Sequence, residues 1–156
     1  MIEIKIPGQN DIQIEHIVFD VNGTLAVDGK LIPEVPALFE TLGNKVKLHL
    51  LTADTHGKQA EIDQQLRLMA NRVKSGGEAE QKAAYVNKLG SNHTVAVGQG
   101  ANDSLMLKEA RIGICVLSEE GTALETLLQA DLVVPDIVSA LRIINQPTRL
   151  IASLRK

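Results

Sequence analysis

The sequence predicts an α/β fold in which a doubly wound, mostly parallel sheet is covered by helices and follows an N-terminal β-hairpin. Short apolar runs alternate with helical patterns along the whole 156-residue chain. Hydrophobic residues make up 44% of the chain and aromatic residues only 2%, so aliphatic side chains must fill the core, which suits strands buried on both faces. Because no linker interrupts the alternation, we expect one domain over residues 1–156.

Isoleucines alternate with polar residues on both sides of the turn-rich segment 7–11, at positions 2, 4 and 6 and again at 12 and 14. This period of two predicts the hairpin. A central strand over Ile17–Asp20 follows it, and then a flap with the turn pair Asp28-Gly29. We next expect a helix over about Pro33–Leu42 and a strand that ends at Thr52.

Five further helices and three further strands complete the alternation. Segment 74–77 is predicted to be a loop within the domain. The helices are expected near Lys58–Val73, Ala79–Leu89, Asp103–Ala110, Thr122–Ala130 and Ile137–Ile144, and the strands near Val95, Ile114 and Val133.

The most informative segment is the apolar run that closes on Asp20 and continues into Asn22-Gly23-Thr24. Open parallel sheets bind ligands at the carboxyl ends of their strands, so a carboxylate at this position is placed for chemistry. A strand-ending aspartate that only caps a loop is the alternative, since one short motif does not separate the two.

Three more segments follow in order. They are Thr52-Ala53-Asp54 after a strand, Lys82 at the start of a helical pattern, and the run 98–103 with Gln99, Asn102 and Asp103. Together with Asp20, this ordered set resembles the four motifs of the haloacid-dehalogenase-like (HAD) superfamily. Thr52-Ala53-Asp54 is also similar to the Thr-Gly-Asp of P-type ATPases, and the resemblance extends over residues 17–138.

The resemblance implies that Asp20 attacks phosphorus and forms an aspartyl phosphate, a known role of carboxylate nucleophiles. It also implies a Mg²⁺ cofactor, a hard cation that prefers oxygen ligands. Thr52 could instead cap the next helix, and Lys82 could be a solvated helix residue. The implied catalytic residues are Asp20, Asn22, Thr52 and Lys82; the implied phosphate site is Asp20, Gly23, Thr52, Ala53, Lys82 and Asn102; and the implied metal site is Asp20, Asn22, Gln99 and Asp103.

Two positions depart from the family pattern. HAD phosphatases usually have a general acid–base Asp where this chain has Asn22, and an amide does not exchange a proton near neutral pH. Gln99 stands where the family usually has a metal-binding Asp. We therefore expect a magnesium-dependent phosphohydrolase or phosphotransferase with slow turnover; a catalytically silent binding or regulatory module is the alternative. His56 either lends a proton or is polar surface.

The spacings between motifs predict a site without a cap domain. Asp20 and Thr52 are 32 residues apart, and Thr52 and Lys82 are 30 apart, which ordinary strands, helices and the flap use up. The nucleotide-binding domain of P-type ATPases has no counterpart. An open site suits a phosphorylated small molecule or macromolecule, and a homo-oligomer stays possible.

Charge and composition argue against other classes. The net charge is −3 and no cluster of Lys or Arg is interleaved with aromatic residues, so we expect no nucleic-acid partner. No apolar run approaches the ~18 residues of a membrane span, and residues 1–10 lack a signal-like apolar stretch, so we expect a cytoplasmic protein. Cys115, the single cysteine, is expected in the core.

Overall fold

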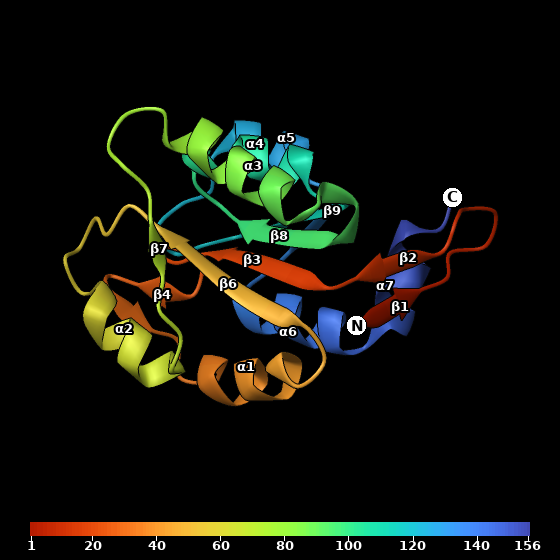
Figure 1. Ribbon diagram of the computed structural model, residues 1–156, viewed down its shortest axis with the longest axis horizontal. Helices are drawn as coiled ribbons and strands as arrows, with labels where there is room; N and C mark the ends of the chain where they lie inside the picture. The colour runs from red at the N-terminus through yellow and green to blue at the C-terminus, as the bar shows by residue number, and fades with distance from the viewer.

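A six-stranded parallel sheet forms the centre of the computed structural model, which describes residues 1–156 (Figure 1). The strand order is β10-β9-β8-β3-β6-β7, and every neighbouring pair in the sheet is parallel. The predicted α/β class is thereby confirmed. The strands are β3 (His16–Asp20), β6 (Lys47–Thr52), β7 (Asn71–Arg72), β8 (Thr94–Gly98), β9 (Ile112–Val116) and β10 (Leu132–Val134).

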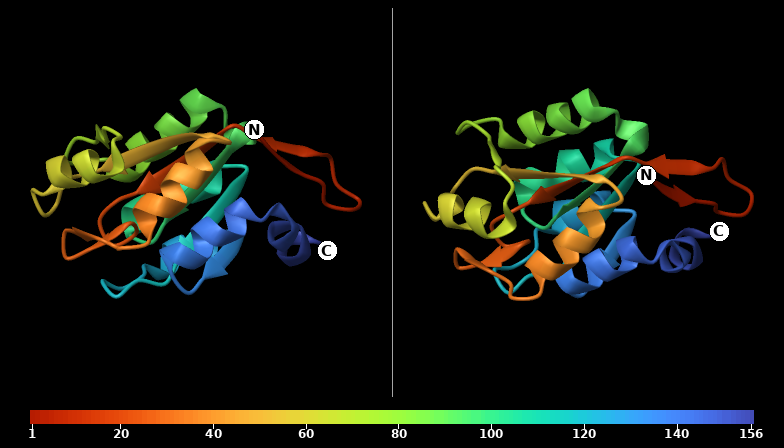
Figure 2. Two further views of the ribbon diagram at one scale, coloured as in Figure 1. Left: turned by 90° about the horizontal axis from the view of Figure 1, so that it is seen from below. Right: turned by 60° about the horizontal axis from the view of Figure 1, so that its bottom comes forward.

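Helices cover both faces of the sheet (Figures 1 and 2). On one face, Val18, Ala96 and Cys115 pack in an apolar cluster with Val86 of α3 and Met106 of α4. On the other face, a larger cluster joins the sheet to α1, α2 and α6. The helices are α1 (Val35–Gly43), α2 (Gln59–Leu66), α3 (Glu78–Leu89), α4 (Ser104–Glu109), α5 (Leu124–Gln129), α6 (Ile137–Asn145) and α7 (Pro147–Leu154), with single 3-10 turns at Ser91–His93 and Ala101–Asp103.

The N-terminal hairpin is confirmed. Strands β1 (Ile2–Ile4) and β2 (Ile12–Ile14) pair antiparallel, with Ile2 opposite Ile14. Their isoleucines are buried in the larger cluster, which also contains Leu150 of α7. The hairpin and α7 lie together at one end of the molecule, beyond the sheet (Figure 1). Helix α7 is an element that the sequence did not predict.

The flap after β3 is also confirmed. Strands β4 (Ala26–Val27) and β5 (Lys30–Leu31) pair antiparallel around Asp28 and Gly29. Both turn residues have positive φ, 50° and 74°, as a two-residue type I′ hairpin turn requires. Besides β6 and the start of α3, which carry the motif residues Thr52 and Lys82, the segments between the motifs contain only this flap, α1, α2 and β7, so there is no cap domain.

The helix predicted over Lys58–Val73 is wrong in its second half. Helix α2 ends at Leu66 because Arg67 adopts a left-handed conformation, with φ 52°. The chain then turns, held by Asp63, whose Oδ1 accepts the Ala70 N–H at 3.1 Å. Asn71–Arg72 continue as β7, parallel to Leu51–Thr52.

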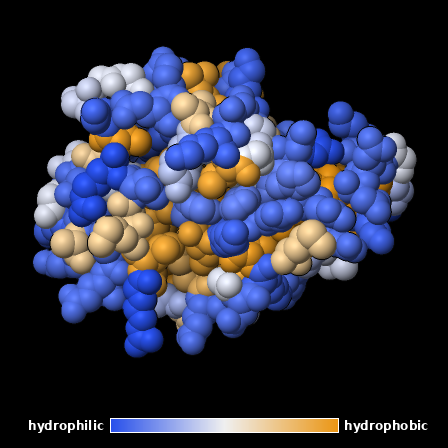
Figure 3. Space-filling view, viewed as in Figure 1, coloured by the Kyte–Doolittle hydropathy of each residue, from blue (hydrophilic) through white to orange (hydrophobic).

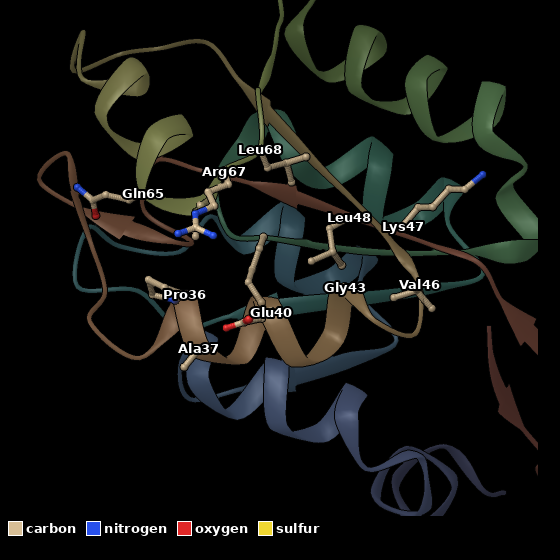
Figure 4. A pocket seen from close by; sticks show the side chains of 12 residues that line it. Pro36, Ala37, Glu40, Gly43, Val46, Lys47, Leu48, Gln65, Arg67 and Leu68 are labelled. Carbon is tan, nitrogen blue, oxygen red and sulfur yellow. The ribbon is translucent and has the colours of Figure 1, made fainter.

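A groove of about 810 Å³ lies between α1, β6 and the end of α2 (Figure 4). Its lining includes Phe39, Val46, Leu48 and Leu66, and Figure 3 shows hydrophobic surface between β6 and α1. Strand β7 pairs with only two residues of β6, so the outer edge of residues 47–50 has no strand partner. None of the helices combines the length and the apolar content that a membrane crossing requires.

Strand β9 packs closely on helix α4 at Gly113. A Cβ at this position would lie 2.4 Å from the Leu107 carbonyl oxygen, which belongs to the helix backbone and cannot rotate away. Gly113→Ala should therefore lower the free energy of unfolding by about 1 to 3 kcal/mol, as overpacking does. The control is Gly43→Ala, whose Cβ would meet Leu48 at an ordinary 3.7 Å. Urea denaturation that gave both variants wild-type stability would contradict this packing.

A chain of hydrogen bonds beside β6 makes stability depend on pH. Asn71 donates to the Tyr85 hydroxyl, and the His49 ring lies 3.0 Å from both Tyr85 Oη and His16 Nδ1. A neutral ring can accept at one nitrogen and donate at the other, whereas a protonated ring only donates. Burial, together with His16 and Lys47, lowers the pKa of His49 to about 4.

Because this pKa lies below the value of about 6.5 for an unfolded histidine, the unfolded state binds more protons between these two pH values. The contribution of His49 to stability is complete above about pH 6.5 and is lost as the pH falls toward 4. His49→Gln should flatten this loss in denaturation curves taken from pH 7.5 to 4.5, while the exposed control His93→Gln should keep it. Identical pH curves for His49→Gln and wild type would refute the assignment.

Candidate functional site

The four sequence segments meet at the carboxyl edge of the sheet. Asp20, Thr52 and Gly98 are the last residues of the adjacent strands β3, β6 and β8, and Lys82 reaches them from the second turn of α3. Parallel strands present their carboxyl ends at one edge, so the three loops that follow surround one site. Together with Glu120 of the loop after β9, they line a pocket of about 160 Å³. The lining residues are Asp20, Asn22, Ala53, Thr55, His56, Gln99, Gly100, Asn102 and Glu120.

Lys82 forms the centre of the charge arrangement. Its Nζ lies 2.7 Å from Asp20 Oδ1 and 2.7 Å from Asp103 Oδ1, and its side chain is 0% exposed. Burial alone would lower the pKa of Lys82, but the two carboxylates outweigh it and raise that pKa above its ordinary value. Burial and the charge of Asp103 raise the pKa of Asp20 to about 7, against the opposing effects of Lys82 and Thr24. The cluster thus holds one cation between two acids.

Both carboxylate oxygens of Asp103 have partners within the protein. Its Oδ1 is held by Lys82, and its Oδ2 accepts the backbone N–H groups of Gln99 and Gly100, each at 3.0 Å. The side chain is fully buried and does not line the pocket. In this arrangement Asp103 orients Lys82 and the loop after β8, and its role as a metal ligand stays a prediction.

Asp20 is oriented by Thr24 as well as by Lys82. Thr24 Oγ1 donates to Asp20 Oδ2 at 3.1 Å, and both side chains are nearly inaccessible. Sequence analysis indicated Thr24 only as part of a turn. The spacing of four residues within one tight loop is the signal that could have identified this hydroxyl.

Thr52 connects the first two motifs. Its Oγ1 accepts the Asp54 N–H at 2.8 Å and the Asn22 side-chain amide at 3.2 Å. Since both contacts use the oxygen as acceptor, neither uses the hydroxyl proton. The Thr52 side chain is fully buried and lies behind the residues that line the pocket. Ala53 and Asn22 line the pocket directly.

Gly23 has a steric role that the sequence did not show. Its φ is +81°, and a Cβ there would lie 1.8 Å from Gln99 Nε2, so the Gln99 side chain crosses this glycine. The Gly23 N–H already donates to the Ala26 carbonyl at 2.8 Å. The Gly23 N–H is therefore already used, and the lack of a side chain makes room for Gln99; a contribution of Gly23 to phosphate binding stays a prediction.

Asn102 lies at the inner side of the pocket. Its Oδ1 accepts a bond from Lys82 at 3.4 Å, and its Nδ2 donates to Glu78 at 2.9 Å. Both contacts hold the amide between α3 and the loop after β8, and its place beside a phosphate stays a prediction.

The outer rim of the pocket carries His56 and Glu120. His56 Nε2 lies 3.4 Å from Glu120 Oε1, and Glu120 Oε2 accepts the Asp28 N–H of the flap at 3.2 Å. Glu120 had no sequence signal, because it comes from a loop 64 residues away from His56.

The oxygen atoms that face the pocket determine how well a metal fits. No group of three or more His, Cys, Asp or Glu side chains is arranged to hold an ion. Asp20, Asn22 and Gln99 offer oxygen donors along the pocket wall, but only Asp20 can carry a negative charge. Mg²⁺ commonly keeps waters and takes one or two carboxylates plus substrate phosphate, so this donor set fits a weak, substrate-assisted site.

Known proteins were compared with the chain by sequence and by structure. No protein-family model matches it. An uncharacterized protein of Methanocaldococcus jannaschii is 37% identical over 92 residues, which span 56% of this chain and 99% of that protein. That relative therefore covers little more than half of the fold described above.

Solved structures agree over most of the chain. A 3-deoxy-D-manno-octulosonate 8-phosphate phosphatase of Moraxella catarrhalis, in complex with magnesium, phosphate and KDO, is 17% identical with a TM-score of 0.68, covering 91% of this chain and 94% of that one. A phosphoserine phosphatase is 18% identical with a TM-score of 0.62, covering 85% of this chain and 100% of that one.

A zinc-transporting PIB-type ATPase in the E2.Pi state is 26% identical with a TM-score of 0.64. The match covers 80% of this chain but only 20% of the transporter, so the chain spans about a fifth of that protein's length. The chain belongs to one family with the Methanocaldococcus jannaschii protein and has the fold of the HAD superfamily, without a cap.

Proposed function

We propose that the chain is a magnesium-dependent phosphohydrolase or phosphotransferase of the HAD type, with Asp20 as the phosphoryl acceptor and with slow turnover. The observation that carries the proposal is the placement of Asp20. Its carboxylate ends β3 at the wall of the pocket, and one oxygen is held by Lys82 while the other is held by Thr24. The phosphatases among the similar structures support the reaction class.

The first half-reaction needs little beyond positioning and charge. A carboxylate oxygen of Asp20 attacks phosphorus, and the bond between phosphorus and the leaving oxygen breaks. Lys82 neutralises the phosphoryl oxygens, and Thr52 donates its free hydroxyl proton to one of them. Asp103 keeps Lys82 in place through its 2.7 Å contact.

The metal would be held by Asp20, the backbone carbonyl of Asn22 and the side-chain oxygen of Gln99. When bound, Mg²⁺ neutralises charge on the transferring phosphoryl group. With a single carboxylate among these donors, the protein depends on phosphate oxygens to complete the site, and a high magnesium requirement follows.

Slow turnover follows from Asn22. The second half-reaction needs a group that takes a proton from water, and the Asn22 amide donates to Thr52 instead. A positioned general acid or base contributes about 10²- to 10⁴-fold, so the aspartyl phosphate should decay more slowly than it would with Asp at position 22. Without a cap, the open site suits a phosphorylated small molecule or an exposed phosphate on a macromolecule.

A catalytically silent binding module is the second candidate. It is favoured by Gln99, whose amide lies across Gly23 where a carboxylate would strengthen metal binding. Fold alone does not decide between the two.

A screen of phosphate esters with and without Mg²⁺ tests the proposed function, with Asp20→Asn as the blank. The enzyme hypothesis predicts magnesium-dependent hydrolysis by the wild type alone. Equal rates for both proteins across the panel would reject it in favour of the binding module.

Beryllofluoride with Mg²⁺ should raise the melting temperature of the protein. This ligand occupies the place of a phosphoryl group on the nucleophile, and a ligand that binds only the native state stabilises it by mass action. At 100 times its Kd it would add about 2.7 kcal/mol. Asp20→Ala should abolish the shift in differential scanning fluorimetry. A wild-type melting temperature that does not change at saturating Mg²⁺ and fluoride would count against a phosphoryl site.

A further inference from the structure

Three loops from distant parts of the chain fix the ring of His56 at the mouth of the pocket. Glu120, after β9, lies 3.4 Å from His56 Nε2 and also accepts the Asp28 N–H of the flap at 3.2 Å. On the other side, Gly29 packs on His56, since a Cβ at Gly29 would lie 3.2 Å from the His56 Cβ. The His56 side chain is 33% exposed and that of Glu120 is 22% exposed, so both remain open to the pocket and to water.

These two residues are the unused titratable groups of the pocket. Its lining contains only three side chains that can exchange a proton, namely Asp20, His56 and Glu120. Asp20 is the nucleophile, and Asn22 cannot transfer a proton. A histidine whose ring is oriented by a carboxylate is the arrangement that many enzymes use for proton transfer.

We propose that His56, oriented by Glu120, is the group that transfers protons in this site. The inference rests on the proposed function and assigns to this pair the role that Asn22 cannot fill. Glu120 is a positioning residue: it accepts the Nε2 proton, which leaves Nδ1 as the exchanging nitrogen. The flap contact through Asp28 keeps Glu120 in place.

The protons balance over the two half-reactions. In the first, the bond between phosphorus and the ester oxygen breaks, and protonated His56 gives its proton to that oxygen. In the second, neutral His56 takes a proton from water while the water oxygen bonds to phosphorus. The bond between phosphorus and Asp20 then breaks, Asp20 leaves as a carboxylate, and inorganic phosphate and protonated His56 remain.

The charges around His56 are mixed. Glu120 faces the ring, Lys58 packs on the same Gly29, and Asp28 ends the flap above it. In the second half-reaction the ring must be neutral. The decay of the aspartyl phosphate should therefore be faster at a pH where the ring is neutral than at a pH where it is protonated.

The test follows the phosphoenzyme after one turnover with p-nitrophenyl phosphate and Mg²⁺, by acid quench. This ester has a good leaving group, so its attack by Asp20 does not depend on His56. Labelling of His56→Gln should match wild type, whereas decay should be about 10²-fold slower or more and should lose its pH dependence. His93→Gln, a histidine exposed at the opposite end of the strands, is the matched control and should decay like wild type.

Two further measurements separate chemistry from folding. Imidazole should restore the decay rate of His56→Ala, which a loss of folding would not allow. Glu120→Gln should slow decay less than His56→Gln and shift its pH profile, and Glu120→Asp should partly restore the rate.

The outcomes are distinguishable. If the wild type forms no phosphoenzyme, as is expected for Asp20→Asn, the proposed function itself is overturned. A labelled wild type with unchanged decay in His56→Gln overturns only the present inference. Slow decay in Glu120→Gln with normal decay in His56→Gln also overturns it, because Glu120 would then be the base.

Discussion

Lys82→Met should lower the free energy of unfolding by about 3 to 5 kcal/mol, the range found when a buried ion pair loses one partner. Methionine fills a similar volume, so the loss would come from charge and not from a cavity. Without the ammonium, the two carboxylates of Asp20 and Asp103, 8% and 0% exposed, would share one cluster with no cation. Urea denaturation at neutral pH measures this loss directly.

Asp20→Asn is the matched control within the same cluster. It removes one of the two acids and leaves Lys82 paired with Asp103 at 2.7 Å, so the buried charges balance. We expect its stability to equal or exceed that of the wild type, although activity is lost. If both variants were destabilised to the same degree, packing and not charge would explain the cluster.

The architecture of the sheet could be predicted from the sequence because its strands are unusually clear. The apolar runs at β3, β8 and β9 are buried along nearly their whole length, and β3 ends at the polar residue Asp20 while β8 is followed by the polar residue Gln99. The end of α2 could not be predicted, because Arg67 adopts its left-handed conformation without a glycine. The sequence pattern did not predict helix α7, because its hydrophobic face is short and packs on the hairpin and not on the sheet.

The sequence predicts which residues lie near one another at the strand ends. It does not predict which of several available partners each side chain contacts. Strand order alone brings Asp20, Thr52 and the loop after β8 together. Sequence does not tell whether Asp103 faces the pocket or turns inward to Lys82, since both fit the same spacing. Nor does it bring Glu120 to His56, a contact that depends on how three loops pack.

Asn22→Asp should raise turnover with a phosphate ester, because it places a proton-transferring carboxylate beside Asp20. A general acid or base supplies about 10²- to 10⁴-fold. If His56 already provides part of this acid–base catalysis, the increase in turnover caused by Asn22→Asp should lie near the lower end of this range when His56 is present. The increase caused by Asn22→Asp should be larger in the His56→Gln background, because the effects of two substitutions that alter the same catalytic role do not add.

Gln99→Asp should change the affinity for Mg²⁺ and not the proton-transfer step. A second carboxylate beside Asp20 strengthens Mg²⁺ binding, so the variant should reach half-maximal activity at lower magnesium. In the absence of metal, the added charge raises the pKa of the neighbouring carboxylates by repulsion, so the gain should appear only as magnesium saturates. The measurement is turnover against magnesium concentration for wild type, both single variants and the double variant.

The double variant decides between an attenuated enzyme and a binding module. With both acids restored, the site has a nucleophile, a phosphate clamp, a metal site and an acid–base group on an unchanged scaffold. We expect the highest turnover of the series at the lowest magnesium. If the double variant hydrolyses no ester of a broad panel at saturating magnesium, the amides are not what limits catalysis, and a module that binds phosphate without turning it over becomes the better account of this fold.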